Sequence, residues 1–363
     1  MQTAFTSVRA QRRYYDIDLL RFFAAVSVMF LHYLVRGFAD GDHQSPVFYG
    51  SIANFFKYNY LAVNLFFMIS GFVILMTAES GNAWSFLRSR ILRLYPAYWF
   101  CVTVSFVLTY CFTNHIFNLT FPRYIVNLTM LNGFFGIGFI DGVYWTLLVE
   151  LKFYILILII LLLGKIAQIE YFLLAWLLIG LLQVIFKLPF LEKYLITNFA
   201  AFFIAGCVFY RISRNGLSWL RIVMLAATIP LGIHFELVDL VRRAAHYKGL
   251  TYHPEMVAII CMSFYLIFAM VILRRATVSP VYATSANKLG SLSYPLYLIH
   301  GPTGLVIYNL VGSKVDKWFL LALITLGMVG FAYFINKYVE KPLAAWLKEK
   351  LPPSTSSKVA SLV

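Results

Sequence analysis

The first long apolar stretch of the sequence carries two ionisable side chains, Arg21 and His32. In an α-helix, residues with this spacing fall within roughly 20° of the same face and about 16 Å apart along the axis. Ala25 and Val28 lie between them, and their small side chains would leave a slot for a thin, extended ligand. An imidazole in such a slot could act as a general base. The alternative is structural: Arg21 reaches the lipid headgroups and His32 donates to a backbone carbonyl.

A third ionisable group, Glu150, lies inside another apolar stretch, close to the expected depth of His32. A carboxylate beside an imidazole fixes the tautomer of the ring and favours its protonated form, as a base that takes a proton from a hydroxyl requires. We therefore predict that His32 and Glu150 form a catalytic pair. The alternative, an ion pair between Glu150 and Lys152, is geometrically poor because residues two apart in a helix point in different directions.

Three arginines, Arg88, Arg90 and Arg93, precede a further apolar stretch. Arg90 and Arg93 share a face if this segment is helical. Guanidinium groups bind phosphate oxygens through paired hydrogen bonds, so the cluster suits an anionic, nucleotide-like ligand that arrives from the cytosol. Membrane orientation alone would also place arginines here, and both interpretations stay open.

Near the C-terminal end, Ser293, Tyr297 and His300 recur at intervals of four and three residues, as on one face of a helix. His300 is expected near the middle of the membrane. It either lines the same cavity as His32 or bonds to a neighbouring helix.

The composition shows what kind of fold must position these groups. Of the 363 residues, 61% are hydrophobic and 12% are charged, whereas soluble domains have roughly 45–50% apolar and about 25% charged residues. The excess apolar side chains must face lipid, which excludes a soluble enzyme and predicts an all-α, polytopic membrane protein.

The net charge of +15 does not indicate a nucleic-acid partner, because the basic residues cluster at the ends of apolar segments. The four cysteines lack the spacing of a disulfide framework or a zinc site, and we expect no bound metal.

Spanning the hydrocarbon core takes roughly 20 helical residues, and about ten stretches qualify as transmembrane helices. We expect one membrane-embedded domain over residues 1–342 and a short, weakly ordered cytoplasmic tail over residues 343–363. Most Lys and Arg residues fall on the side that holds both termini, so both termini are expected in the cytoplasm. The ten stretches run near residues 16–36, 60–78, 94–112, 143–163, 170–187, 197–212, 217–235, 255–273, 290–310 and 318–337.

Five motifs in order along the chain resemble those of the acyltransferase 3 family of integral-membrane O-acyltransferases, over roughly residues 15–342. The chain departs from the family pattern at Asn64, where many members carry Asp, and at Lys341, where Arg is commoner. Neither position touches the predicted chemistry, although Asn64 could alter helix contacts or acceptor choice. The motifs are Arg21 with His32; Ser70, Gly71 and Phe72; Arg90 and Arg93 with Tyr95 and Pro96; Trp145 and Thr146 with Glu150; and Ser293 and Tyr294 with His300 and Pro302.

The resemblance implies acyl transfer from acetyl-CoA or another acyl-CoA, with no tightly bound cofactor. The donor would bind from the cytosol with its phosphates near Arg90 and Arg93, helped by Arg21. His32, oriented by Glu150, would either deprotonate a sugar hydroxyl of the glycan acceptor or carry the acyl group itself. The remaining pocket residues would be Ser70, Trp145, Tyr294 and His300.

The resemblance also implies a place and a set of partners. The protein would lie in the bacterial cytoplasmic (inner) membrane, act on a cell-surface or secreted polysaccharide such as lipopolysaccharide or exopolysaccharide, and contact other polysaccharide-assembly proteins.

A transporter or flippase of a glycan intermediate is the main alternative, since intramembrane Arg, His and Glu also line substrate pathways. Such proteins often consist of paired halves with broken helices, and the sequence has no such symmetry. An ion channel is less consistent with the sequence because rings of like charge are missing.

Overall fold

The computed structural model describes residues 14–39, 44–79, 82–247, 250–274 and 279–353, and every regular element in these ranges is helical. The predicted all-α fold is therefore confirmed. The α-helices are α1 (Tyr15–Leu31), α2 (Gly37–Ala39), α3 (Ala53–Phe56), α4 (Ala62–Glu79), α5 (Ala83–Phe112), α6 (Asn114–Phe117), α7 (Phe121–Asn127), α8 (Trp145–Leu162), α9 (Ile169–Phe186), α10 (Pro189–Leu195), α11 (Thr197–Asn215), α12 (Trp219–His246), α13 (Pro254–Leu273), α14 (Pro280–Ile299), α15 (Gly301–Val311), α16 (Lys317–Phe334) and α17 (Lys341–Lys350).

Within the described ranges, eight helices are long and apolar enough to cross a membrane, and a ninth span results if the bent pair α10–α11 is counted as one. A polytopic membrane protein is thus confirmed, with a span count slightly below the predicted ten. The difference lies at residues 290–310. There the chain forms α14 and α15 with a break at His300, and the polar residues of α14 keep it below the hydropathy of a typical span.

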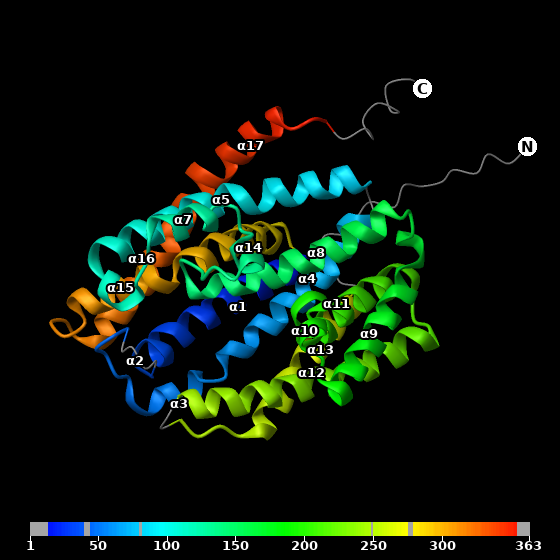
Figure 1. Ribbon diagram of the computed structural model, residues 1–363, viewed down its shortest axis with the longest axis horizontal. Coiled ribbons are helices and arrows are strands. Elements are labelled where there is room, and N and C mark those ends of the chain that lie inside the picture. The colour runs from blue at the N-terminus through cyan, green and yellow to red at the C-terminus, as the bar shows by residue number, and fades with distance from the viewer. Residues whose placement is uncertain (1–13, 40–43, 80–81, 248–249, 275–278, 354–363) are drawn as a thin grey trace, which may run out of the picture.

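The centre of the bundle is α1, which packs between α14 and α4 (Figure 1). On its far side α4 packs against α11 through two glycines. A Cβ atom at Gly71 would lie 2.1 Å from the Phe203 carbonyl oxygen, and one at Gly206 would lie 1.9 Å from the Met68 carbonyl oxygen. Because glycine has no side chain, the two backbones can approach this closely.

Helices α9, α12 and α13 form the periphery on one side of the bundle. In the apolar part of α12, 28% of the residues are buried, against 72% in the apolar span Gly50–Glu79 that contains α4. The large exposed hydrophobic residues of α9, α12 and α13 would be costly in water, so these are the surfaces that face lipid.

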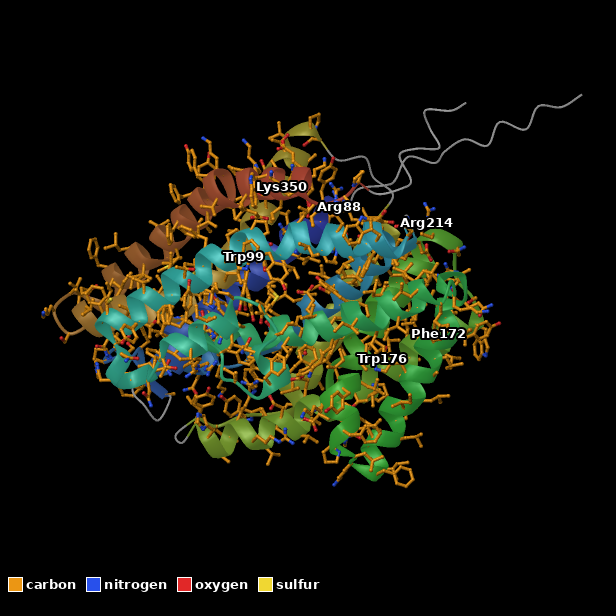
Figure 2. The ribbon with its side chains drawn as sticks, turned by 45° about the horizontal axis from the view of Figure 1, so that its top comes forward. Arg88, Trp99, Phe172, Trp176, Arg214 and Lys350 are labelled. Atoms are coloured by element: carbon orange, nitrogen blue, oxygen red, sulfur yellow. The ribbon has the colours of Figure 1, made fainter. Side chains whose placement is uncertain are left out.

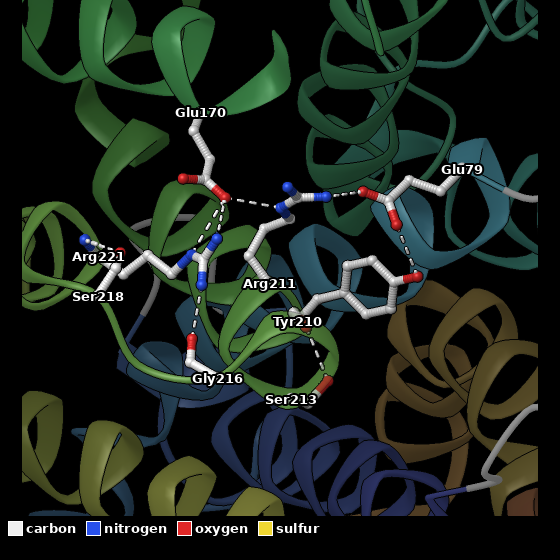
Figure 3. Close-up of polar contacts among 8 residues, drawn as sticks. All are labelled: Glu79, Glu170, Tyr210, Arg211, Ser213, Gly216, Ser218 and Arg221. Atoms are coloured by element: carbon white, nitrogen blue, oxygen red, sulfur yellow. Dashed lines mark hydrogen bonds and ion pairs between the residues drawn. The ribbon is translucent and has the colours of Figure 1, made fainter. Parts of the chain in front are cut away.

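An ion-pair network joins four helices at one end of the bundle (Figure 3). Arg211 of α11 contacts Glu79 of α4 at 2.5 Å and Glu170 of α9 at 2.7 Å, and Arg221 of α12 contacts Glu170 at 2.8 Å. Tyr210 donates to the second Glu79 oxygen at 3.0 Å. Each charge has an opposite partner, so the network fixes the relative positions of these helices where the apolar core ends.

The same end holds the start of α5, and we call it the arginine end. Arg88 donates to the Lys348 carbonyl of α17 at 2.6 Å, and Arg88, Arg214 and Lys350 mark this end in Figure 2. Residues 343–350, expected in a weakly ordered tail, instead continue as helix α17. Residues 354–363 of that tail lie outside the described residues.

Two π-helical turns interrupt the long helices, at His32–Arg36 (η1) and Ile335–Glu340 (η7). Such turns are rare, and they recur at functional sites because the extra residue re-aims side chains. Here η1 begins at His32, and η7 ends at Glu340, the ion-pair partner of Arg93. We call the end of the bundle that contains η1 the histidine end.

Candidate active site

Two imidazoles meet at the histidine end. The rings of His32 and His300 lie with their centroids 5.1 Å apart in an edge-to-face arrangement, and both side chains are buried. Tyr33, the next residue in η1, donates its hydroxyl hydrogen to the His300 carbonyl at 2.7 Å. His300 therefore lies beside His32, although neither histidine is in the lining of the two cavities described below.

The His300 ring has one committed nitrogen and one unpaired nitrogen. Nδ1 lies 3.1 Å from the Leu296 carbonyl oxygen, so the ring donates there. Within the described residues, Nε2 is buried and has no hydrogen-bond partner. Buried polar atoms are normally satisfied, so an unpaired one indicates a place where a ligand group can bind.

Asp141 is a candidate that the sequence analysis missed. It directly precedes the segment Gly142–Leu162, and its Oδ1 caps that segment by accepting from the Val143 N–H at 2.9 Å. Its Oδ2 is buried without a hydrogen-bond partner in the described part of the chain, and it lies against Gly301, the neighbour of His300. Burial raises the pKa of Asp141 to about 7. In the sequence this residue looks like an ordinary helix cap.

Glu150 lies deeper, towards the arginine end. Its carboxylate accepts hydrogen bonds from Ser70 and from Tyr154, the latter at 2.7 Å. Asp141 lies level with His300 at the start of this segment, and Glu150 is nine residues further along the chain, in the second turn of α8. Glu150 thus bonds to Ser70 and Tyr154, whereas the His32 ring packs against His300, and the pairing of His32 with Glu150 stays a prediction.

A cavity of about 50 Å³ has Glu150 in its lining. Tyr297 connects it to the histidine pair, because its hydroxyl lies 2.8 Å from the Thr146 hydroxyl and its ring is 5.7 Å from the His300 ring. Four residues of the predicted site line this cavity: Arg21, Ser70, Glu150 and Tyr294. The full lining is Arg21, Val63, Phe66, Phe67, Ile69, Ser70, Thr146, Leu147, Glu150, Ser293, Tyr294 and Tyr297.

The two predicted phosphate-binding arginines differ in their surroundings. Arg93 forms an ion pair with Glu340 at 2.6 Å, and its guanidinium lies 5.2 Å from the centre of the Tyr294 ring. Arg90 donates through Nε to Ser89 at 3.1 Å and lies over the Tyr154 ring. Arg93 therefore already has a carboxylate partner, which the sequence analysis did not identify.

Trp145 lies apart from the other predicted pocket residues. It lines a larger cavity of about 700 Å³ at the histidine end, together with Asn64 and residues of α9 to α12. Val63 lines both this cavity and the one around Glu150, so the two adjoin. Asn64, singled out as a departure from the family pattern, lies beside the Glu236 carboxylate.

Two comparisons with known proteins found a match. Residues 14–337 match a family model described as "Acyltransferase domain". Nodulation protein 10 of Rhizobium leguminosarum bv. viciae is 32% identical over 159 residues, a match that covers 39% of this chain and 42% of that relative. No solved structure matches. Because the family model covers most of the chain and agrees with the all-helical membrane fold, the chain belongs to the acyltransferase domain family.

Proposed function

We propose that the protein is a membrane O-acyltransferase that moves an acyl group, normally acetyl, from cytosolic acyl-CoA to a sugar hydroxyl of a cell-surface or secreted polysaccharide. The observation that carries this proposal is a connected line of polar groups through an apolar bundle. It starts at Arg90 and Arg93, passes Arg21 and Glu150, and ends at the His32–His300 pair. Intramembrane ionisable groups are costly, so an aligned series indicates a reaction path.

The arginine end would receive the donor. In this proposal it faces the cytosol, as expected for a bacterial inner-membrane protein with both termini inside. Arg90 would bind the phosphates of acyl-CoA. Arg93 would also bind them, through the guanidinium hydrogens that its ion pair with Glu340 does not use. The thin pantetheine arm would enter the cavity at Arg21 and Glu150, which at about 50 Å³ must widen to admit it.

The histidine end would perform the chemistry. The imidazole of His32 takes the proton from the sugar hydroxyl, and the hydroxyl oxygen attacks the thioester carbonyl. The new C–O bond forms as the C–S bond breaks, and the CoA thiolate leaves with the proton that the imidazole held. The unpaired Nε2 of His300 and Oδ2 of Asp141 lie where a hydroxyl group would find an acceptor.

The experiment is transfer by the purified protein in lipid nanodiscs. Labelled acetyl-CoA is the donor, and the glycan fraction from a strain that lacks this gene is the acceptor. We expect His32→Ala to reduce transfer by about 10²–10⁴-fold, with folded protein retained. His115→Ala, at an exposed histidine of α6, is the control. Near wild-type transfer by His32→Ala would remove His32 from the chemistry. Glycan movement across the membrane without release of CoA thiol would favour a flippase.

A further inference from the structure

The large cavity at the histidine end has the features of a binding site that the proposed chemistry has not yet used. It is a groove of about 700 Å³ whose walls come from the turn Asn59–Leu61 and from α4, α8, α9, α10, α11 and α12. The residues that carry the argument are Tyr60, Asn64, Trp145, Phe235, Glu236 and Arg243. A volume of this size suits one or two sugar rings and greatly exceeds that of the cavity at Glu150.

The groove leads to the reaction centre. Val63 lines both the groove and the Glu150 cavity, so the two adjoin at this residue. Arg243, on the groove wall, lies close enough to His32 for its positive charge to act on the imidazole. A ligand in the groove would therefore reach the histidine pair from the side opposite to the arginine end, where the donor would enter.

The charges in the groove are largely balanced. Arg243 pairs with Asp239 at 2.5 Å and lies 3.9 Å from the centre of the Tyr60 ring. The deepest charged group is Glu236, which is 4% exposed and lies beside the Asn64 amide. The exposed cations, Lys187 and Arg242, lie at the rim. A negatively charged group would be repelled from the deep end, whereas a hydroxyl would find a carboxylate and an amide there.

Aromatic residues complete the deep part of the groove. Trp145 and Phe235 are only partly buried, and both line the groove. Flat apolar rings suit the C–H faces of a sugar, while the neighbouring polar groups bind its hydroxyls. Glu236 and Asn64 bond to each other, and each keeps further hydrogen-bonding positions that a sugar hydroxyl can use and a lipid tail cannot.

We propose that this groove binds the acyl acceptor as a sugar ring without negative charge, stacked on Trp145 and Phe235 and hydrogen-bonded to Glu236, with the reacting hydroxyl directed past Val63 towards His32. The inference rests on the proposed acyl transfer and adds the place and the charge class of the acceptor.

The test uses the transfer assay with the same glycan fraction and four variants. Glu236→Gln removes the charge but keeps the shape, and Phe235→Ala removes the ring. Their controls are Glu255→Gln and Phe190→Ala, at exposed positions outside the groove lining. We expect Glu236→Gln to raise the apparent KM for the glycan about tenfold, as for the loss of a hydrogen bond to a charged group. Phe235→Ala should raise it severalfold. The KM for acetyl-CoA should change less than twofold in both.

Each other outcome contradicts a defined part of the inference. Unchanged glycan KM in both variants would exclude the groove as the acceptor site. A fall in glycan KM in Glu236→Gln would show an anionic acceptor that the carboxylate repels. Parallel rises in the KM values for glycan and acetyl-CoA would show that the substitutions disturb the fold and not the acceptor site alone. Absence of transfer by the wild-type protein would refute the proposed function, and with it this inference.

Discussion

The unpaired carboxylate oxygen of Asp141 should make stability depend on pH. Its Oδ1 caps the helical segment at Val143, while Oδ2 is buried against Gly301 without a hydrogen bond from the described residues. Burial penalises the ionised form and raises the pKa from 3.8 to about 7. Asp141→Asn keeps an oxygen for the cap and cannot ionise, so it isolates the cost of the charge.

The sign follows from proton linkage. Because the folded-state pKa lies above the unfolded value, the folded state binds more protons between the two values. The free energy of unfolding of the wild-type protein should therefore fall as pH rises from about 4 to about 7 and level off above that. At about 1.36 kcal/mol for each pH unit, the difference between 3.8 and about 7 corresponds to about 4 kcal/mol. This cost should be absent from Asp141→Asn.

The assay is the apparent melting temperature in nanodiscs from pH 5 to pH 9. Asp141→Asn should melt above the wild-type protein at pH 8, and the two should converge towards pH 5. Asp316→Asn is the matched control, because Asp316 caps α16 at Trp318 and Phe319 in an exposed position. Identical pH profiles of wild type and Asp141→Asn, or a lower melting temperature of the variant at pH 8, would refute the reasoning.

Two further variants test the donor site and the helix packing. Arg93→Ala should raise the Kd for acetyl-CoA about tenfold in calorimetric titration, because it removes one phosphate-binding guanidinium; an unchanged Kd would restrict Arg93 to its ion pair with Glu340. Gly206→Ala places a methyl group 1.9 Å from the Met68 carbonyl oxygen, so the backbones of α4 and α11 must separate. It should lower the free energy of unfolding by at least about 1–3 kcal/mol, seen as loss of folded protein in size-exclusion chromatography. Gly327→Ala, with open space around it, should be neutral.

The spans were largely predictable from the sequence, since an uncharged run of about 20 residues has few alternatives to a transmembrane helix. The exception is the ninth predicted span. Residues 290–310 contain Pro295 and break at His300, and the resulting pair α14–α15 packs in the bundle interior against α1 and α5. Hydropathy alone cannot separate such a buried, broken helix from a regular span.

The candidate site was predictable in its residues but not in its pairings. Helical periodicity placed Arg21 and His32 on one face, yet η1 begins at His32 and changes the spacing from there on. Depth was estimated by counting residues from the end of each span, and an error of two turns displaces a side chain by about 11 Å. This is enough to place Glu150 beside His32 in the prediction, whereas the structure has Ser70 and Tyr154 bound to Glu150 and His300 against His32.

The contacts that a single sequence could not reveal are those between residues far apart in the chain. Glu340 pairs with Arg93 across 247 positions, and Asn64 of α4 lies beside Glu236 of α12. Asn64 is itself one of the two departures from the family pattern, and Glu340 directly precedes the other, Lys341. An Asp in place of Asn64 would set two carboxylates against each other in a buried wall of the groove, at a large electrostatic cost unless one took up a proton. Asn64 instead adds a neutral amide beside the Glu236 carboxyl group, which connects the departure at this position to the uncharged sugar that we propose for the groove.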